Sequence, residues 1–238
     1  MLGFKIPEER RIEWFCKKAA RWDPFEIRRY EEFYKRFLTE KAAPEKKKLG
    51  LKLIVISDTH GYLVFDKSRF PTFMDTVADF DLCLLLGDVT AAEMPVILDC
   101  IPREKILAIK GNHDAFDIYS RFGVQEISGR VCEYQGVRFA GLDGSFRYKK
   151  ERFPSHTQYE SLQLARAMPE ADVLLSHDVM LSDFYRDPAH SGLIGITYYV
   201  FKRGVQWHFH GHIHKSYERC YENGTREKSV YQCEYIEI

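Results

Sequence analysis

Four histidines recur at every second position in the run WHFHGHIH, at residues 207–214. Imidazole nitrogens bind metal ions and titrate near neutral pH. The run therefore fits a metal site, a pH-sensitive patch or a strand rich in histidine. In a continuous strand all four side chains would share one face. We expect Gly211 to end the regular strand, so that His208 and His210 lie on it and contribute packing or support beneath a site.

Four segments upstream also end a short apolar run with oxygen or imidazole donors. They are LKLIVISDTH (51–60), DLCLLLGD (81–88), KILAIKGNHD (105–114) and ADVLLSH (171–177). Short apolar runs of this kind are typical of buried strands. Ligands collect beyond the carboxyl ends of strands in open α/β sheets. We therefore expect these donors to meet those of the histidine run at one edge.

The donors that follow the five strands are Asp58, His60, Asp88, Asn112, His177, His212 and His214. They are too many for one four-coordinate zinc ion, and no thiolate is among them. Mixed carboxylate, amide and imidazole donors favour Mn, Fe or Zn, with Mg, Co or Ni as alternatives. If Asp88 bridges, the set holds two metal ions about 3.5–4 Å apart, which clamp the oxygens of a phosphoryl group.

Each donor also has an ordinary structural explanation when it is taken alone. Asp58 and Asp88 fit helix N-caps or turns, Asn112 fits a turn beside Gly111, and His177 fits the core or the surface. These explanations predict no correlation among five strand ends. The recurrence of donors at all five ends therefore favours a shared metal site.

The five blocks resemble the calcineurin-like metallophosphoesterase family. That family's pattern is D-x-H, GD, GNH[DE], a lone His after a strand, and GHxH, and all five blocks occur in order within residues 51–215. One block alone has little specificity, whereas the ordered set has much more. The chain reads SHDVM where the family often has a Pro after the lone His, and KSYERC follows GHIH in place of an NPGS-like turn. Both departures alter the walls of the site but remove no donor.

The resemblance divides the donors between two metal ions. The implied ligands are, for one ion, Asp58, His60 and His214 and, for the other, Asn112, His177 and His212, with Asp88 between them. A hydroxide that bridges the metals would be the nucleophile, because two Lewis acids lower the pKa of bound water.

The resemblance also implies the proton donor. His113 would protonate the leaving-group oxygen, and Asp114 would orient it. Arg147, Arg186 and His190 lie in long loops and are candidate contacts for the substrate phosphate, with simple surface positions as the alternative. The predicted activity is that of a metal-dependent phosphoric ester hydrolase, with a phosphodiester as the expected substrate and a phosphomonoester as the alternative.

The segments between the donors predict the architecture. Residues 70–80 have helical character, and strands alternating with helices at this pitch predict a parallel α/β core. Residues 131–135 and 137–143 add strands in the second half of the chain. The expected fold is a four-layer α-β-β-α sandwich, in which two packed mixed sheets are flanked by helices.

The cysteines and the ends of the chain bear on the cellular compartment. The six cysteines form no C-x-x-C pair, and a two-residue turn at Asn223-Gly224 would place Cys220 opposite Glu227 rather than Cys233. The start MLGFKIPEERR lacks the apolar stretch of a signal peptide, and no apolar run approaches a membrane span. We expect a reduced, cytoplasmic protein that does not partner a membrane.

The first 50 residues differ from the rest in charge. They carry 14 Lys and Arg against 9 Asp and Glu, whereas the remainder carries 21 against 26. Residues 8–41 have the spacing of two helices, and 41–50 reads as a linker. We expect a helical extension and linker over residues 1–48 and a metallophosphoesterase domain over 49–238. The extension is a candidate self-association surface.

Three functions compete at this stage. The first is a dinuclear metal-dependent phosphoesterase with a small phosphoester substrate. The second is a noncatalytic metal-binding scaffold of the same fold, which the intact His113 and the full donor set argue against. The third is a nuclease guided by the basic N-terminal helices. Nucleic acid is not favoured, because the formal net charge of the chain is zero and glutamates interrupt the basic residues.

Overall fold

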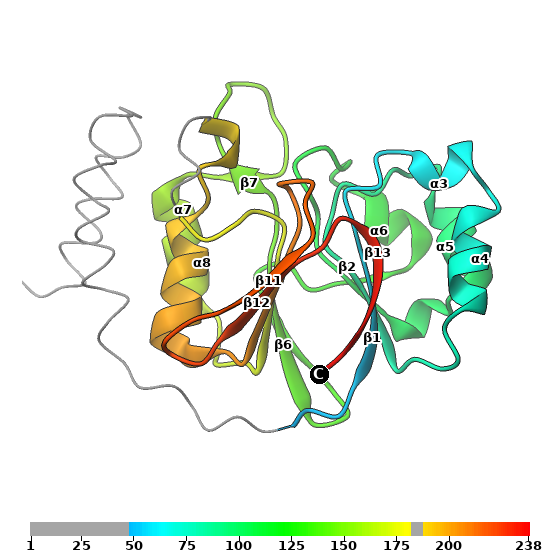
Figure 1. Cartoon of the computed structure of the whole chain (residues 1–238). Coiled ribbons are helices and arrows are strands. Elements are labelled where there is room, and N and C mark those ends of the chain that lie inside the picture. Colours follow the sequence, from blue (N-terminus) through cyan, green and yellow to red (C-terminus); the bar gives the residue numbers. More distant parts are fainter. Residues whose placement is uncertain (1–47, 182–187) are drawn as a thin grey trace, which may run out of the picture.

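Two mixed sheets lie face to face in this computed structural model, which describes residues 48–181 and 188–238 (Figure 1). The first sheet contains β1 (Lys52–Ser57), β2 (Leu82–Leu85), β3 (Ile106–Ala108), β4 (Gln125–Glu126) and β13 (Gln232–Glu237), in the order β13–β1–β2–β3–β4. The second contains β5 (Val131–Tyr134), β6 (Val137–Leu142), β9 (Val173–Ser176), β10 (Trp207–His210), β11 (Tyr217–Cys220) and β12 (Arg226–Ser229), in the order β11–β12–β10–β9–β6–β5.

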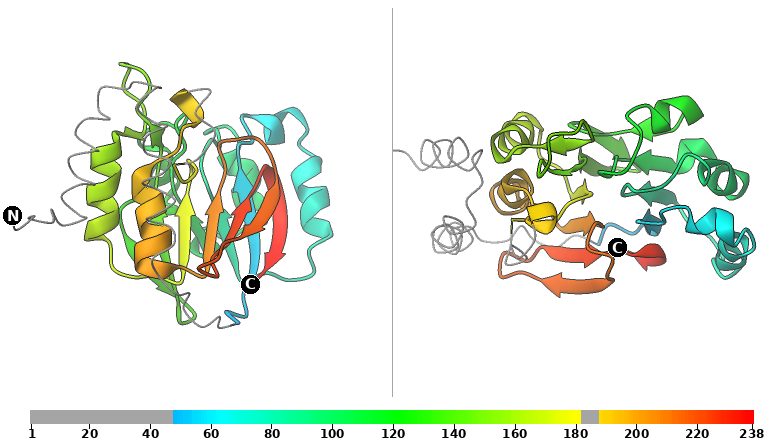
Figure 2. Two further views of the ribbon diagram at one scale, coloured as in Figure 1. Left: turned by 60° about the vertical axis from the view of Figure 1, so that its left-hand side comes forward. Right: turned by 90° about the horizontal axis from the view of Figure 1, so that it is seen from above.

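Helices cover the outer face of each sheet (Figures 1 and 2). Those on the first sheet are α3 (Tyr62–Phe65), α4 (Arg69–Asp75), α5 (Met94–Cys100), the 3-10 helix η1 (Arg103–Lys105) and α6 (Ile118–Phe122). Those on the second are α7 (Gln158–Ala167), α8 (Ile194–Tyr198) and its π-helical continuation η3 (Tyr199–Gly204). The predicted four-layer α-β-β-α sandwich is confirmed. The predicted helices within residues 8–41 lie outside the described residues, as does Arg186.

The central strands β1 and β2 are apolar on both faces because both faces of the first sheet are covered there. In β1, Leu53 and Val55 face the other sheet, whereas Ile54 and Ile56 face the helices. This alternation is the two-residue period of a strand, and double coverage is why β1 reads as a continuous apolar run. A third cluster fills the space between the second sheet and its helices α7 and α8. No helix among residues 48–181 and 188–238 is long and apolar enough to cross a membrane.

The carboxyl ends of the central strands meet at one edge. Strands β1, β2 and β3 are parallel to one another, and so are β6, β9 and β10. The segments that follow these strands are joined by backbone hydrogen bonds, from Asp58 N to Gly87 O (3.1 Å) and from Gly211 N to His177 O (3.2 Å). Strand β13 follows β12 in the chain but pairs antiparallel with β1, so the C-terminal segment ties the two sheets together.

The hairpin near the C-terminus has a longer loop than predicted. Cys220 pairs with Arg226 rather than with Glu227, so the predicted two-residue turn is wrong. The Asn223 side chain is buried and donates to Val200 O (3.3 Å), which holds the tip of the hairpin against η3. Tyr221 and Thr225 lie in the loop beyond the paired strands, and Tyr221 N donates to Thr225 O (2.9 Å). No disulfide joins the five described cysteines, which are Cys83, Cys100, Cys132, Cys220 and Cys233.

Phe139→Ala tests the packing between the sheets. Phe139 on β6 is fully buried in the cluster between the sheets, whereas Phe65 at the end of α3 is 90% exposed. We expect Phe139→Ala to lower the free energy of unfolding by about 3–5 kcal/mol, because it removes a ring and leaves a cavity. Phe65→Ala, the matched control, should change it by less than about 0.5 kcal/mol. Urea titration measures both, and equal effects would contradict this packing.

Candidate metal centre

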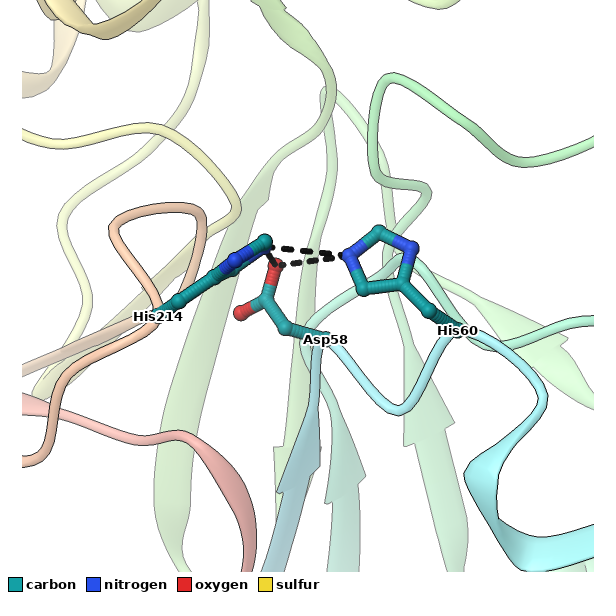
Figure 3. A group of neighbouring side chains, drawn as sticks. All are labelled: Asp58, His60 and His214. Carbon is teal, nitrogen blue, oxygen red and sulfur yellow. Dashed lines mark hydrogen bonds and ion pairs between the residues drawn. The ribbon is translucent and has the colours of Figure 1, made fainter. Parts of the chain in front are cut away.

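Three donors from two sheets form one group at the carboxyl edge (Figure 3). Asp58 and His60 follow β1, and His214 follows β10. His60 Nε2 lies 3.1 Å from His214 Nε2. Asp58 Oδ1 lies 3.6 Å from His214 Nε2 and 4.0 Å from His60 Nε2. The three donor atoms therefore surround one point, as the ligands of one ion would.

A second group shares Asp58 and lies deeper. Asp58, Asp88 and His177 are all buried, with donor atoms within 4.8 Å of one another. Asp88 Oδ2 is 3.5 Å from His177 Nε2 in its own group and 3.6 Å from His60 Nε2 in the first, so it is close to an imidazole of each group. His177 Nε2 is 2.9 Å from Asn112 Oδ1. His177 Nδ1 lies 2.8 Å from Leu86 O, a contact that fixes the ring and leaves Nε2 facing the carboxylates.

One oxygen of each central carboxylate lacks a hydrogen-bond partner. Asp58 Oδ1 and Asp88 Oδ2 are buried without one among the described residues. The other oxygens are well used: Asp58 Oδ2 accepts from Ser57 Oγ (2.7 Å), and Asp88 Oδ1 accepts from His113 N (2.8 Å). Leaving a buried acceptor unsatisfied is costly unless something binds it. These oxygens, with the imidazoles around them, fit divalent metal ions.

The electrostatics of the cluster also favour cations. Burial raises the pKa of Asp58, but the nearby His214 imidazole and the charge of His177 lower it below its ordinary value overall. The pKa of Asp88 is likewise lowered, because His177 and the His113 N–H outweigh burial. Burial lowers the pKa of His177, yet the charge of Asp88 raises it overall. The carboxylates are therefore ionised, and the site attracts positive charge.

Backbone strain is concentrated at the predicted ligands. Seven described residues other than glycine have a positive φ, and five of them are predicted ligands: Asp58 (54°), His60 (46°), Asp88 (55°), His212 (69°) and His214 (49°). Side chains other than glycine adopt this left-handed region at a cost, and such residues gather at functional sites. Sharp turns after the strands thus aim the donors at one place, a feature that the sequence pattern did not reveal.

Two glycines let the loops approach closely enough to form the site. A Cβ on Gly111 would collide with the side chain of Asp88. A Cβ on Gly211 would collide with Ser57 Oγ and Asp58 Oδ2. The glycines that precede the Asn and His donors are therefore required by the approach of neighbouring loops, not by the metal chemistry itself.

His212 lies beside the second group, with its Nε2 turned aside. Its ring centre is 4.9 Å from that of His177, but Nε2 lies 2.7 Å from Ala189 O. Its backbone N donates to Asp58 Oδ2 (2.8 Å), which links the second sheet to the first carboxylate. His190, a predicted substrate contact, lies 4.7 Å from the His212 ring, centre to centre.

His113 and Asp114 have different surroundings. The His113 side chain is exposed, with its ring centre 5.5 Å from that of His60. Asp114 is buried and accepts from the backbone N–H groups of Gly111 (2.7 Å), Asp88 (3.0 Å) and Val89 (3.1 Å). Burial and the charge of Asp88 raise the pKa of Asp114 to about 7, although these backbone bonds act the other way. Asp114 thus holds the loops after β2 and β3 together, and its contacts with the backbone position the His113 segment.

A buried glutamate that the sequence analysis missed also holds the loops. Glu93 accepts from Thr59 Oγ1 (2.9 Å), Leu63 N (3.0 Å) and Thr90 N (2.8 Å), so it joins the segments that follow β1 and β2. The available signal was the pattern Thr90-x-x-Glu93, which resembles a capping box.

The other two histidines of the run belong to a buried polar network. Strand β10 ends at His210, as predicted. His208 and His210 face away from the space between the sheets, into which the alternate residues Trp207 and Phe209 point. His210 Nε2 lies 3.4 Å from Glu227 Oε1 on β12, and His208 Nε2 lies 2.7 Å from Ser176 Oγ. Glu227 was also missed by the sequence analysis.

Comparison with protein families agrees with this geometry. Residues 51–228 match the profile of the calcineurin-like phosphoesterase superfamily domain. The chain belongs to this superfamily. A comparison with curated protein sequences found no match. Membership agrees with the candidate ligand groups and leaves the substrate and the metal open.

Solved structures of low sequence identity share the fold. Phosphopantetheinyl hydrolase (PptH) from Mycobacterium tuberculosis is 14% identical, with a TM-score of 0.53, and the match covers 78% of this chain and 91% of that one. The protein TT1561 of Thermus thermophilus is 9% identical, with a TM-score of 0.55, and the match covers 79% of this chain and 99% of that one. At these identities the likeness concerns the fold alone.

Glu227→Gln tests the buried network. Burial raises the pKa of Glu227, but the hydrogen bond and charge of His210 lower it more, to about 2, from an ordinary value of 4.5. The carboxylate therefore stabilises the fold above pH 4.5, and this contribution is lost as the pH falls from 4.5 to about 2. We expect the free energy of unfolding of Glu227→Gln at pH 7 to be about 1–3 kcal/mol lower than that of the wild type. As the pH falls from 4.5 to about 2, the variant should lose less of its free energy of unfolding than the wild type does.

Urea titration in a chelator, repeated at several pH values, measures this effect without bound metal. Glu218→Gln is the control, because Glu218 on β11 is 43% exposed in its pair with Arg226. If the free energy of unfolding varies with pH in the same way in the wild type and in Glu227→Gln, the network does not hold a charged carboxylate.

Proposed function

We propose that this protein is a dinuclear metal-dependent phosphoesterase that hydrolyses phosphodiesters, with phosphomonoesters as the alternative class of substrate. The observation that carries the proposal is the pair of buried oxygens, Asp58 Oδ1 and Asp88 Oδ2, which lack hydrogen-bond partners among the described residues. Both lie within 4.0 Å of imidazole nitrogens. Superfamily membership supports it, because the profile matches the part of the chain that contains every donor.

The donors divide into two sets. The residues that would hold the metals are, in the first set, Asp58, His60 and His214 and, in the second, Asn112, His177 and His212, with Asp88 between them. Two bound ions would supply Lewis acidity, which neutralises phosphoryl oxygens and lowers the pKa of the attacking water. The donor types favour Mn, Fe or Zn.

His113 is the proposed general acid. Its side chain is exposed beside His60, and its backbone N–H donates to Asp88 Oδ1, so the segment is fixed while the ring stays accessible. An imidazole has an ordinary pKa near neutrality and can therefore give a proton to a leaving alkoxide. Asp114 and Gly111 hold the turn that places this ring.

His113→Ala should show which substrates need the proton. A p-nitrophenolate can leave as the anion, whereas an alkoxide needs a proton in order to leave. We expect turnover of a dialkyl phosphodiester to fall by about 10²–10⁴-fold and turnover of bis(p-nitrophenyl) phosphate to fall much less. Steady-state kinetics on both esters, with metal content measured in the same samples, checks this. Equal losses on the two esters, at unchanged metal content, would mean that His113 does not act as the acid.

Asp88→Asn tests the shared carboxylate. The substitution keeps the shape of the side chain but removes the charge that two ions would share. We expect bound metal to fall from two ions to one or none per chain and turnover to fall at least about 10²-fold. Elemental analysis of the purified protein measures the metal.

The control is Asp79→Asn, because Asp79 is 68% exposed in its pair with Lys52. Two ions retained in Asp88→Asn would contradict the bridging role. Two ions in the wild type without turnover of any phosphoester would instead favour a noncatalytic scaffold.

A further inference from the structure

A cavity of about 520 Å³ opens among the loops that follow β3 and β6. Its floor and walls include Lys110, Phe116, Asp143, Arg147, Arg152 and His156. Lys110 lies two residues before Asn112, and its carbonyl accepts from Gly144 N (2.7 Å). Asp143 follows β6, whose last residue accepts from His177 N (3.4 Å) through the Leu142 carbonyl. The cavity therefore lies at the same edge of the sheets as the metal centre.

The floor of the cavity is an internally matched set of charges. Asp143 Oδ1 lies 3.1 Å from His156 Nε2, and Asp143 Oδ2 lies 3.4 Å from Lys110 Nζ. Lys110 also pairs with Glu126. Burial raises the pKa of Asp143, but the hydrogen bond with His156 and the charge of Lys110 lower it overall. Because the charged groups of the floor are paired with one another, the residues at the rim of the cavity would determine which ligand binds.

The first cation of the rim is paired with an exposed acid. Arg147 Nη2 donates to Ser155 O (3.1 Å), which orients the guanidinium. It also lies 2.9 Å from Glu160 Oε2, in a pair whose side chains are 42% and 46% exposed. Exposed pairs of this kind contribute little free energy. Because both partners face solvent, an anion in the cavity can compete with Glu160 for the guanidinium.

The second cation of the rim is oriented by an aromatic ring. The guanidinium carbon of Arg152 lies 4.8 Å from the centre of the Phe116 ring, which is half exposed. Stacking on a ring fixes the guanidinium plane and leaves its N–H edge for an anion. Lys150 and Glu151 line the same cavity. Residues 150–152 therefore contribute two positive charges and one negative charge to the rim.

We propose that this cavity binds a second phosphate group of the substrate, one that is not hydrolysed. Two oriented guanidiniums on one cavity suit the bidentate geometry that phosphate accepts. The substrate class is then a phosphodiester that carries a further phosphate elsewhere in the molecule. This inference rests on the proposed function, because the metal centre at the same edge of the sheets would hold the ester that is cleaved.

A matched pair of substrates tests the cavity. One is thymidine 5′-(p-nitrophenyl phosphate), and the other is the same ester with a 3′-phosphate. For the Mn²⁺-loaded full chain we expect a kcat/KM about tenfold or more higher for the 3′-phosphorylated ester, through a lower KM. Arg147→Gln and Arg152→Gln should each reduce this preference about tenfold. The control Arg226→Gln should leave it unchanged, since Arg226 is also 44% exposed and stacked on a ring but lies at the opposite end of the sheet.

Equilibrium binding separates this inference from the proposed activity. Calorimetric titration compares thymidine 3′,5′-bisphosphate with thymidine 5′-monophosphate and requires no turnover. Tighter binding of the bisphosphate, lost in Arg147→Gln and Arg152→Gln, would support the cavity even if no ester were hydrolysed. Turnover of both esters with equal KM, together with equal binding of the two nucleotides, would overturn the cavity and leave the phosphoesterase intact.

Discussion

The architecture depends on keeping two ionised carboxylates buried where the two sheets meet. Asp58 and Asp88 each use one oxygen to hold neighbouring loops and present the other without a hydrogen-bond partner among the described residues. Asp58 Oδ2 accepts a hydrogen bond from the backbone N–H of His212. The side chain whose other oxygen is available to a metal ion therefore also joins the first sheet to the second. A chain that buries charge in this way needs a cation to offset it.

The surrounding residues serve that constraint in different ways. Asp114 and Glu93 use both carboxylate oxygens on backbone and hydroxyl donors, so they hold loops and offer nothing to a metal. The positive φ angles turn the donors inward, and Gly111 and Gly211 allow the close approach. The evenly spaced histidines of residues 207–214 therefore have different surroundings. His214 reaches the site from the turn, whereas His208 and His210 stay on the strand in a buried network.

Much of this could be predicted from the sequence, because the period of apolar residues is a local property. The strand over residues 51–57, the end of β10 at His210 and the four layers follow from such patterns. Within the segment 105–114 the strand is short, at Ile106–Ala108, and it begins only at Ile106 because Lys105 ends a 3-10 helix. The hairpin register failed because the buried Asn223 contacts η3, a segment far from it in the chain. Glu93, Glu227 and the turned ring of His212 likewise depend on contacts between distant loops, which no local pattern encodes.

In the proposed site, Asp88 is shared by two metal ions. Anomalous diffraction from crystals grown with Mn²⁺ would locate each ion and its protein ligands. We predict two peaks about 3.5–4 Å apart, both in contact with Asp88, with Asp58 and His214 at one and His177 and Asn112 at the other. A single peak, or two peaks of which only one contacts Asp88, would show that Asp88 is not shared by two ions.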